Sequence, residues 1–198
     1  MFRKLIFIIY IVGLLAPLRM GWCEDYSFRN SKWGLTKEAV TASEIKMDPV
    51  EINENTIKYK TQILENNVEL IYLFSQNKLA GAVYKLNDNY LNSHHFLNTY
   101  KKFKAALTQK YGQPREEMTN WLNDTFRNVS QKRGLALSLG HTEYFANWET
   151  AISNISIRLK EENYSVLCVI EYWSKEYPYL SEENKVEHIN KEDIIDPF

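Results

Sequence analysis

Apolar and polar residues alternate in six short segments of the chain, and this period of two constrains the fold more than any other feature. Three of the segments, at 57–64, 68–74 and 78–86, follow one another with only the polar linkers ENN and SQN between them. Alternation over such lengths is typical of half-buried strands, and short polar linkers are typical of hairpin turns. The sequence therefore predicts an antiparallel meander in this part of the chain.

Three more alternating segments, at 142–148, 152–160 and 164–173, follow a helical pattern over 93–111. Large apolar residues recur in the helical segment at intervals of three or four, and Gly112 comes directly after it. We therefore expect one long helix and then a second meander.

A shorter helix is expected at about 36–45, with Thr36 as its N-cap. Trp33 and Gly34 stand directly before it. A glycine at this position lets the chain turn sharply into the cap. We expect Trp33 to have a structural role, as a wedge between this helix and the sheet.

The order of these elements predicts an α+β domain at 24–180 with two similar halves, at about 28–90 and 91–180. Each half would lay one helix on a three-stranded antiparallel meander, a duplicated pattern of α-β-β-β-α-β-β-β. The halves can join edge to edge in one sheet or pack as neighbours. The conformation of 125–141 stays open, because its alternate leucines suit a strand and its composition suits a helix. The charged segment 181–198 lacks a periodic apolar face and is predicted to be a mobile tail.

The start of the chain has the pattern of an export signal. Arg3 and Lys4 precede an uncharged apolar run at 5–18. This run is nearer to the roughly 7–15 residues of a signal-peptide core than to the roughly 20 of a membrane span, so an uncleaved anchor is the weaker alternative. Small residues before the expected cut predict cleavage after Cys23, which would remove the signal peptide at 1–23 and leave no transmembrane span.

Cysteine content and charge narrow the compartment and the partners. After loss of 1–23 only Cys168 remains, so no intramolecular disulfide can form, which fits a bacterial protein that is periplasmic or secreted. The removed segment holds three basic residues and no acidic one, leaving 21 basic against 25 acidic side chains and a formal net charge of −4. This balance lacks the basic footprint of a nucleic-acid-binding protein, so we expect no nucleic acid partner.

No residue pattern indicates catalysis. Cys168 lies in the apolar stretch SVLCVI, where burial would raise its pKa and leave it a poor nucleophile. His94 and His95 are adjacent, so their side chains diverge too far to chelate one ion. The sequence has no metalloprotease motif, no nucleophile elbow and no glycine-rich phosphate loop. We expect no catalytic residues, no metal and no cofactor, although a site assembled only in the fold stays open.

Aromatic residues make up 14% of the chain, and those of the second half are candidates for a binding surface. The two members of a consecutive pair on a strand point to opposite faces, so some rings are exposed unless both faces are covered. Core filling is the alternative explanation, because aromatic residues favour strands. The predicted binding residues are Trp121, Tyr144, Phe145, Trp148, Tyr172 and Trp173.

The stretch WGLTKEAV at 33–40 resembles the opening found after the signal peptide in uncharacterised bacterial envelope proteins, as do the later YGQP and NWET. More distantly, a short helix of this kind beside a small sheet is similar to the outer-membrane-assembly lipoproteins of the SmpA/OmlA type and to the β-lactamase-inhibitor-like fold. The chain departs from the lipoprotein pattern at Trp22, where a lipobox needs a small residue before Cys23.

These observations favour a non-enzymatic exported module for binding or envelope assembly. Its partner would be an envelope protein, a peptide or a glycan. The alternative is an envelope hydrolase or inhibitor-like protein. A concave cluster of an acid, a histidine and a hydroxyl would favour the enzyme, whereas a flat aromatic patch would favour binding.

Overall fold

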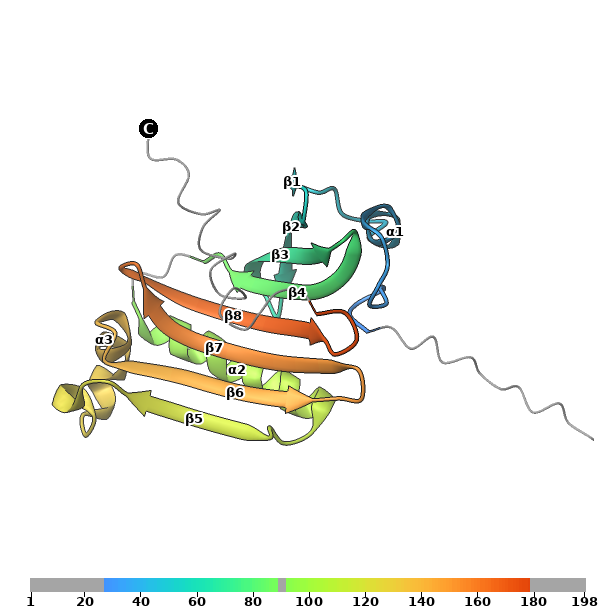
Figure 1. Ribbon diagram of the computed structural model, residues 1–198. Coiled ribbons are helices and arrows are strands. Elements are labelled where there is room, and N and C mark those ends of the chain that lie inside the picture. The colour runs from blue at the N-terminus through green and yellow to red at the C-terminus, as the bar shows by residue number, and fades with distance from the viewer. Residues whose placement is uncertain (1–26, 89–91, 179–198) are drawn as a thin grey trace, which may run out of the picture.

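The computed structural model describes residues 27–88 and 92–178 and places the eight strands of these ranges in one antiparallel sheet (Figure 1). The strands lie in the order β1-β2-β3-β4-β8-β7-β6-β5. Their bounds are β1 Glu51–Ile52, β2 Thr56–Ile63, β3 Asn66–Ser75, β4 Lys78–Leu86, β5 Glu116–Trp121, β6 Thr142–Glu149, β7 Ser153–Glu162 and β8 Ser165–Ser174. The helices are α1 Lys37–Ser43, α2 His94–Tyr111 and α3 Arg133–Ser138, with 3-10 turns η1 Asp124–Phe126 and η2 Ser130–Lys132.

The predicted fold class, a duplicated helix with a three-stranded meander (α-β-β-β-α-β-β-β), is wrong. The six alternating segments do form strands, but β1 and β5 add one strand to each end of the sheet, and α3 lies between β5 and β6. The helices also differ, since α1 has 7 residues and α2 has 18. Alternation does not reveal β5, because EEMTNW is an edge strand whose residues are largely exposed.

The pairing of β4 with β8 makes the sheet continuous. Gly81 lies opposite Trp173 in this pairing, and a Cβ atom at Gly81 would come within 2.6 Å of the Trp173 ring. The absence of a side chain at Gly81 therefore lets the indole lie against the strand.

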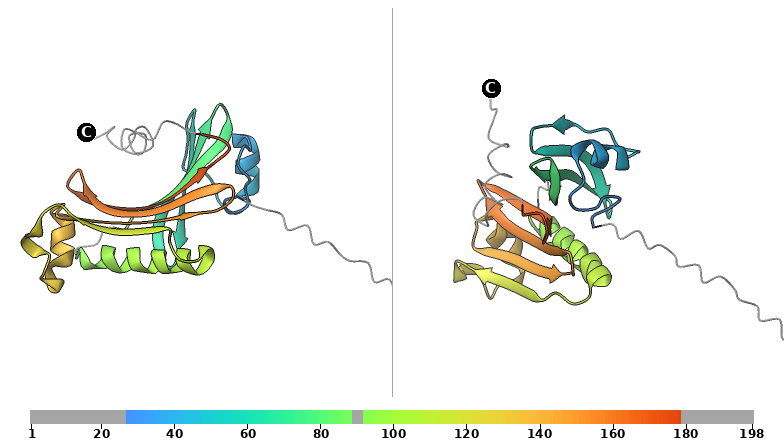
Figure 2. Two further views of the ribbon diagram at one scale, coloured as in Figure 1. Left: turned by 60° about the horizontal axis from the view of Figure 1, so that its bottom comes forward. Right: turned by 45° about the vertical axis from the view of Figure 1, so that its right-hand side comes forward.

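The main core lies on the side of the sheet that carries α1 and α2 (Figure 2). The buried face of α2 contributes Leu97, Tyr100, Phe103 and Leu107, and α1 contributes Val40. Inward-facing residues of the strands complete this core, in which Tyr59, Tyr72 and Phe74 are among the largest fully buried side chains. Packing of this kind is the main source of stability for a domain of this size.

The opposite face of the sheet is concave, and no helix of 27–88 or 92–178 covers it (Figure 2). A smaller apolar cluster lies on it where β3, β4 and β8 meet. Its members are Ile71, Leu73, Ala80, Val83, Val169 and Trp173, with Leu167 and Tyr177 packed against them. Further along the same face, β5 to β8 carry polar side chains.

The segment before α1 has the cap that the sequence predicts. Thr36 Oγ1 accepts a hydrogen bond from Ala39 N at 3.4 Å, and Gly34 has φ of 82°, a left-handed conformation that favours glycine. Trp33 is 9% exposed and stacks on Phe28, with ring centroids 6.4 Å apart. A structural role for Trp33 therefore agrees with its burial.

A buried polar cluster ties the N-terminal segment to α1 and β3. Arg29 donates from Nε to Glu44 Oε1 at 2.8 Å and from Nη2 to Glu44 Oε2 at 3.0 Å. Tyr72 donates its hydroxyl to the same carboxylate, and Arg29 Nη1 donates to the Tyr84 hydroxyl at 3.2 Å. Burial acts to lower the pKa of Arg29, and its hydrogen bonds to Glu44 and Tyr84 outweigh this, so that pKa lies above its ordinary value. The cluster is a structural ion pair, and both oxygens of its carboxylate accept hydrogen bonds.

The predicted signal peptide at 1–23 and the predicted tail at 181–198 lie outside the described residues. In the part of the chain that the structure describes, every helix is too short or too polar to cross a membrane.

Candidate functional site

A hollow of about 760 Å³ lies on the concave face of the sheet, over β5 to β8. Most of its lining is polar and comes from alternate positions of neighbouring strands, whereas Trp148 and Ile155 belong to the core on the helix side. The lining residues are Arg115, Glu116, Phe145, Asn147, Trp148, Glu149, Asn154, Ile155, Ser156, Arg158, Glu171 and Trp173. Because one strand face is shared by every second residue, these side chains are brought together by strand register rather than by sequence proximity.

A row of polar side chains crosses the floor of the hollow from β5 to β8. Strand pairing places Glu116 opposite Asn147, Asn147 opposite Ser156, and Ser156 opposite Glu171. Asn147 Nδ2 donates to Glu116 Oε2 at 3.2 Å, and Ser156 Oγ donates to Glu171 Oε2 at 2.9 Å. The row is therefore hydrogen-bonded at both ends.

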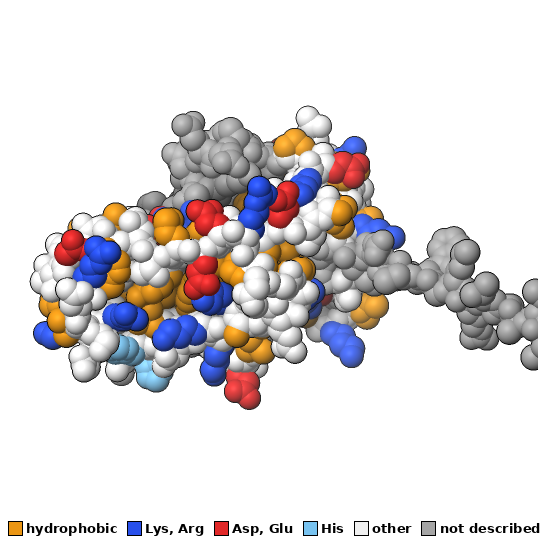
Figure 3. All heavy atoms as spheres, turned by 90° about the horizontal axis from the view of Figure 1, so that it is seen from below, with side chains coloured by type: hydrophobic (Ala, Val, Ile, Leu, Met, Phe, Trp, Pro, Cys, Tyr) orange, Lys and Arg blue, Asp and Glu red, His pale blue; other side chains and the backbone are white. Residues whose placement is uncertain are grey.

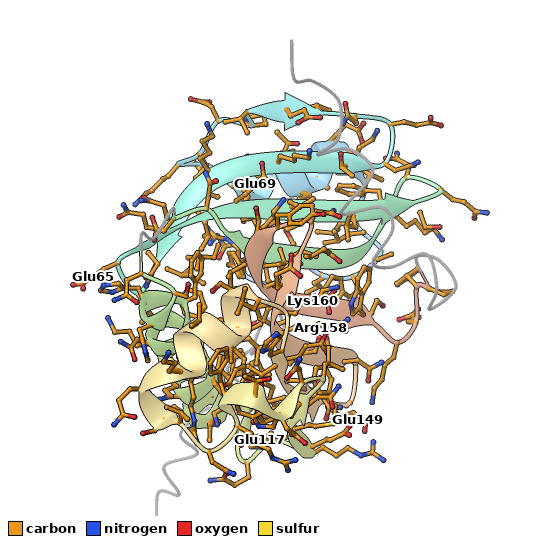
Figure 4. All side chains as sticks on the ribbon, turned by 90° about the vertical axis from the view of Figure 1, so that its left-hand side faces the viewer. Glu65, Glu69, Glu117, Glu149, Arg158 and Lys160 are labelled. Carbon is orange, nitrogen blue, oxygen red and sulfur yellow. The ribbon has the colours of Figure 1, made fainter. Side chains whose placement is uncertain are left out.

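Arg158 lies beside this row, in the next pair of positions along the strands. Figure 4 shows it near Lys160, which belongs to the same strand. Its guanidinium carbon is 5.6 Å from the centroid of the Phe145 ring, and its Nη2 is 3.6 Å from Glu171 Oε2. The Glu171 side chain is only 6% exposed, whereas that of Arg158 is 34% exposed. A buried carboxylate and a half-buried guanidinium thus face the hollow together.

Two polar atoms in the hollow are buried without a hydrogen-bond partner. They are Asn147 Oδ1, an acceptor, and Arg158 Nε, a donor. A buried polar group without a partner costs roughly 1–3 kcal/mol. This is the feature of the hollow that most directly calls for a ligand.

Glu149, one of the lining residues, forms two ion pairs. Glu149 accepts from Arg115 and, at 2.6 Å, from Lys175 Nζ. The hydrogen bond and charge of Lys175, together with the charge of Arg115, hold the pKa of Glu149 below its ordinary value. Glu149 is therefore a charged rim residue and not a candidate proton donor.

The structure divides the six predicted aromatic binding residues between the two faces of the sheet. Phe145 and Trp173 lie on the concave face and line the hollow. Tyr144 and Tyr172 point to the helix side, where their rings lie 5.7 Å from Tyr100 and 4.8 Å from Phe28.

Trp148 and Trp121 complete the division. Trp148 is 3% exposed, and its Nε1 donates to Gly112 O at the end of α2, so its ring also lies on the helix side. Trp121 is half-buried. It lies four residues after Glu117 in β5 and so faces the same side of the sheet, the helix side, where Glu117 pairs with Lys104 of α2. The predicted set is thus not one surface.

Polar residues of the hollow are missing from the predicted set. In β7 the alternate residues Asn154, Ser156, Arg158 and Lys160 are all polar, and this pattern marks the solvent-facing side of a strand. That signal was available in the sequence. That these β7 residues lie next to Asn147 and Glu171 depends on the order of the strands in the sheet, which the sequence does not reveal.

The groups needed for a hydrolytic site do not meet in the hollow. It has carboxylates and the Ser156 hydroxyl but no histidine among its lining residues. Among residues 27–88 and 92–178, no three His, Cys, Asp or Glu side chains gather as a metal site would require. Cys168 is 1% exposed, and burial raises its pKa to about 12. Neither outcome of the expected test, a triad or a flat aromatic patch, describes this site.

No family model, no curated protein and no solved structure was found to match the chain. The resemblance to envelope proteins and to the SmpA/OmlA type therefore stays a prediction. What the protein does must be argued from the site itself.

Proposed function

We propose that the protein is a non-enzymatic binding module whose concave sheet face binds an extended peptide segment of another protein. The observation that carries this proposal is the pair of buried, unpartnered atoms in the hollow, Asn147 Oδ1 and Arg158 Nε. A peptide unit offers an N–H donor and a C=O acceptor a short distance apart. A peptide backbone therefore offers the right kind of partner to each atom, and binding it would offset the cost of leaving them unpaired.

A glycan fits the hollow less well than a peptide. Sugar-binding sites commonly offer an aromatic ring as a flat platform, but one face of Phe145 is occupied by the Arg158 guanidinium. The other aromatic residues of the lining, Trp148 and Trp173, are only 3% and 7% exposed. The remaining lining is dominated by polar and charged groups, which suit peptide backbone and charged side chains.

The proposed location is the bacterial periplasm or the outside of the cell, supported by the signal-peptide pattern at 1–23. Mass spectrometry of the exported protein is expected to give an N-terminus at or near Glu24. A stable form that keeps residues 1–23 would contradict export with cleavage.

The binding proposal is tested with a displayed library of random peptides of about 12 residues. We expect wild-type protein to enrich a family of related peptides. Asn147→Leu and Arg158→Met are expected to weaken their binding about tenfold or more, because each removes one of the unpartnered atoms. Asn98→Leu and Arg127→Met are the matched controls, since both residues are exposed and lie outside the hollow.

Two results would contradict the proposal. One is a library that yields no enriched family. The other is a family whose affinity falls as much with the two control variants as with the two hollow variants. Thermal melts of all four variants separate lost binding from lost folding.

A further inference from the structure

Positive charge is concentrated in one part of the chain. Residues 92–141 carry eight Lys and Arg side chains against three Asp and Glu, a local net charge of +5. The whole chain has a formal net charge of −1, so the remaining residues are acidic on balance. Such asymmetry indicates an anionic partner for this region.

The structure places much of this charge along the exposed side of α2 and around α3, which packs against α2. His94 Nε2 lies 2.8 Å from Gln131 O, which joins the first turn of α2 to η2 and α3. Lys101 and Lys102 are exposed on α2, and Lys132 and Arg133 are exposed at the start of α3. Within the described ranges, none of these four side chains has an ion pair with an acid.

Exposed apolar side chains lie among these cations. The exposed fractions are 61% for Leu122, 39% for Val129, 43% for Leu135 and 52% for Leu139. Leu135 lies in α3 and Leu139 is its C-cap, four residues on, so both lie on one side of the helix. Figure 3 shows basic and hydrophobic side chains next to each other at this end of the molecule.

Contacts around His141 join the segment that holds Leu122 and Phe126 to Lys132, and α2 packs against α3. Leu122 N donates to His141 O at 2.9 Å, and the Phe126 ring stacks on His141 with centroids 5.7 Å apart. Lys132 Nζ lies 5.3 Å from the centroid of the Phe126 ring. We call this surface, formed by Lys101, Lys102, Leu122, Lys132, Arg133, Leu135 and Leu139, the basic-apolar end.

We propose that the basic-apolar end binds the surface of an anionic lipid bilayer. Unpaired cations are attracted by the lipid phosphates, and exposed leucines enter the headgroup region, a combination typical of proteins that bind a membrane surface. Nucleic acid is the less suitable partner, because the nearby Phe126 ring lies between His141 and Lys132 and is not open to stack on a base. This surface is separate from the hollow, since they share no residue.

Sedimentation of the full chain with lipid vesicles tests the proposal. Vesicles with roughly 40% phosphatidylglycerol in phosphatidylcholine are compared with vesicles of phosphatidylcholine alone. The neutral vesicles give the baseline for the apolar run at 5–18, and the variants below separate the basic-apolar end from the three basic residues at 1–23. We expect binding to the anionic vesicles above that baseline, and a decrease as salt is added.

Two variants and their matched controls locate the contact. Lys101→Gln/Lys132→Gln/Arg133→Gln is expected to weaken binding to anionic vesicles about tenfold or more. Lys32→Gln/Lys46→Gln/Lys60→Gln removes the same charge from exposed positions elsewhere and is expected to leave binding nearly unchanged.

The apolar contribution is tested in the same way. Leu135→Ser/Leu139→Ser is expected to weaken binding to anionic vesicles, whereas Ile45→Ser/Val50→Ser changes exposed side chains elsewhere and is expected to have little effect.

Three results would overturn the lipid proposal: no binding above the neutral baseline, equal loss with the control variants, or binding of a fluorescent DNA oligonucleotide that depends on the same three cations while vesicles are not bound. The peptide selection at the hollow is independent of all three, so failure of one proposal is distinguishable from failure of the other.

Discussion

Trp33 Nε1 donates a hydrogen bond to Ser153 Oγ at 2.8 Å and so joins two residues that are 120 positions apart. Ser153 is the first residue of β7 and is 2% exposed, so water does not replace this donor easily. Trp33 therefore connects the segment before α1 to the part of the sheet that carries the hollow.

Trp33→Phe is expected to lower the free energy of unfolding by roughly 1–3 kcal/mol, because it keeps most of the ring and leaves the Ser153 hydroxyl without its donor. Urea denaturation measures the change. Trp121→Phe is the matched control, since Trp121 is half-buried and at the edge of the sheet, and it is expected to change stability much less. Equal losses in the two variants would contradict the role given to the Trp33 bond.

The ion pair between Arg29 and Glu44 gives a second prediction. The Glu44 side chain is 3% exposed and that of Arg29 28%. Removal of the guanidinium therefore leaves a buried carboxylate whose remaining side-chain donor, among the residues that the structure describes, is Tyr72. Arg29→Met is expected to cost roughly 3–5 kcal/mol of stability. Arg127→Met breaks an exposed pair with Asp124 and is expected to cost about 1 kcal/mol or less. Denaturant unfolding measures both variants. An equal loss of unfolding free energy in the two would contradict the prediction.

Much of the sheet could be predicted from sequence, because a period of two is a local property of each strand. The alternating burial along β7 shows it clearly. Edge elements escape this reasoning. The first four residues of β5 are exposed on both faces and the strand carries no hydrophobic period, and β1 consists of only two residues. The prediction of a duplicated fold was wrong because hydrophobic alternation does not reveal β1, β5 or α3.

The hollow could be predicted only in part. Period two correctly separates Phe145 from Tyr144 and Trp173 from Tyr172. It does not say which face is concave, because that depends on how β4 joins β8 and on where α2 packs. The partnership of Arg158 with Glu171 likewise arises from strand register, which no local pattern determines.

Alanine variants of the four paired aromatic residues test this separation of faces. Tyr172→Ala and Trp173→Ala are expected to cost roughly 3–5 kcal/mol, because both side chains are buried. Phe145→Ala is expected to cost about 1 kcal/mol, since its ring is half-buried in the open hollow, and Tyr144→Ala an intermediate amount. Thermal melts measure all four. If Phe145→Ala unfolds the domain as readily as Tyr172→Ala, the ring of Phe145 is core and the hollow is not a binding surface.

The thiol of Cys168 is expected to be unreactive in the folded protein. It is 1% exposed, and burial raises its pKa to about 12, so the thiolate is scarce at neutral pH. A water-soluble thiol reagent should label it slowly, and rapidly once denaturant is added. Rapid stoichiometric labelling of the native protein would contradict this and would reopen a nucleophilic role for Cys168.

Alkaline pH is expected to unfold the protein through its buried tyrosines. Burial raises the pKa of Tyr72, Tyr84 and Tyr172, with a further contribution from Glu44 at Tyr72 and from Tyr111 at Tyr172. A raised pKa in the folded state means that these phenols favour folding fully below their ordinary pKa of about 10, and that this contribution is lost as the pH rises above it. Phenolate absorbance of the buried rings should therefore appear together with loss of the β-sheet circular dichroism signal. Complete ionisation of the tyrosines while that signal is unchanged would contradict the burial of these three side chains.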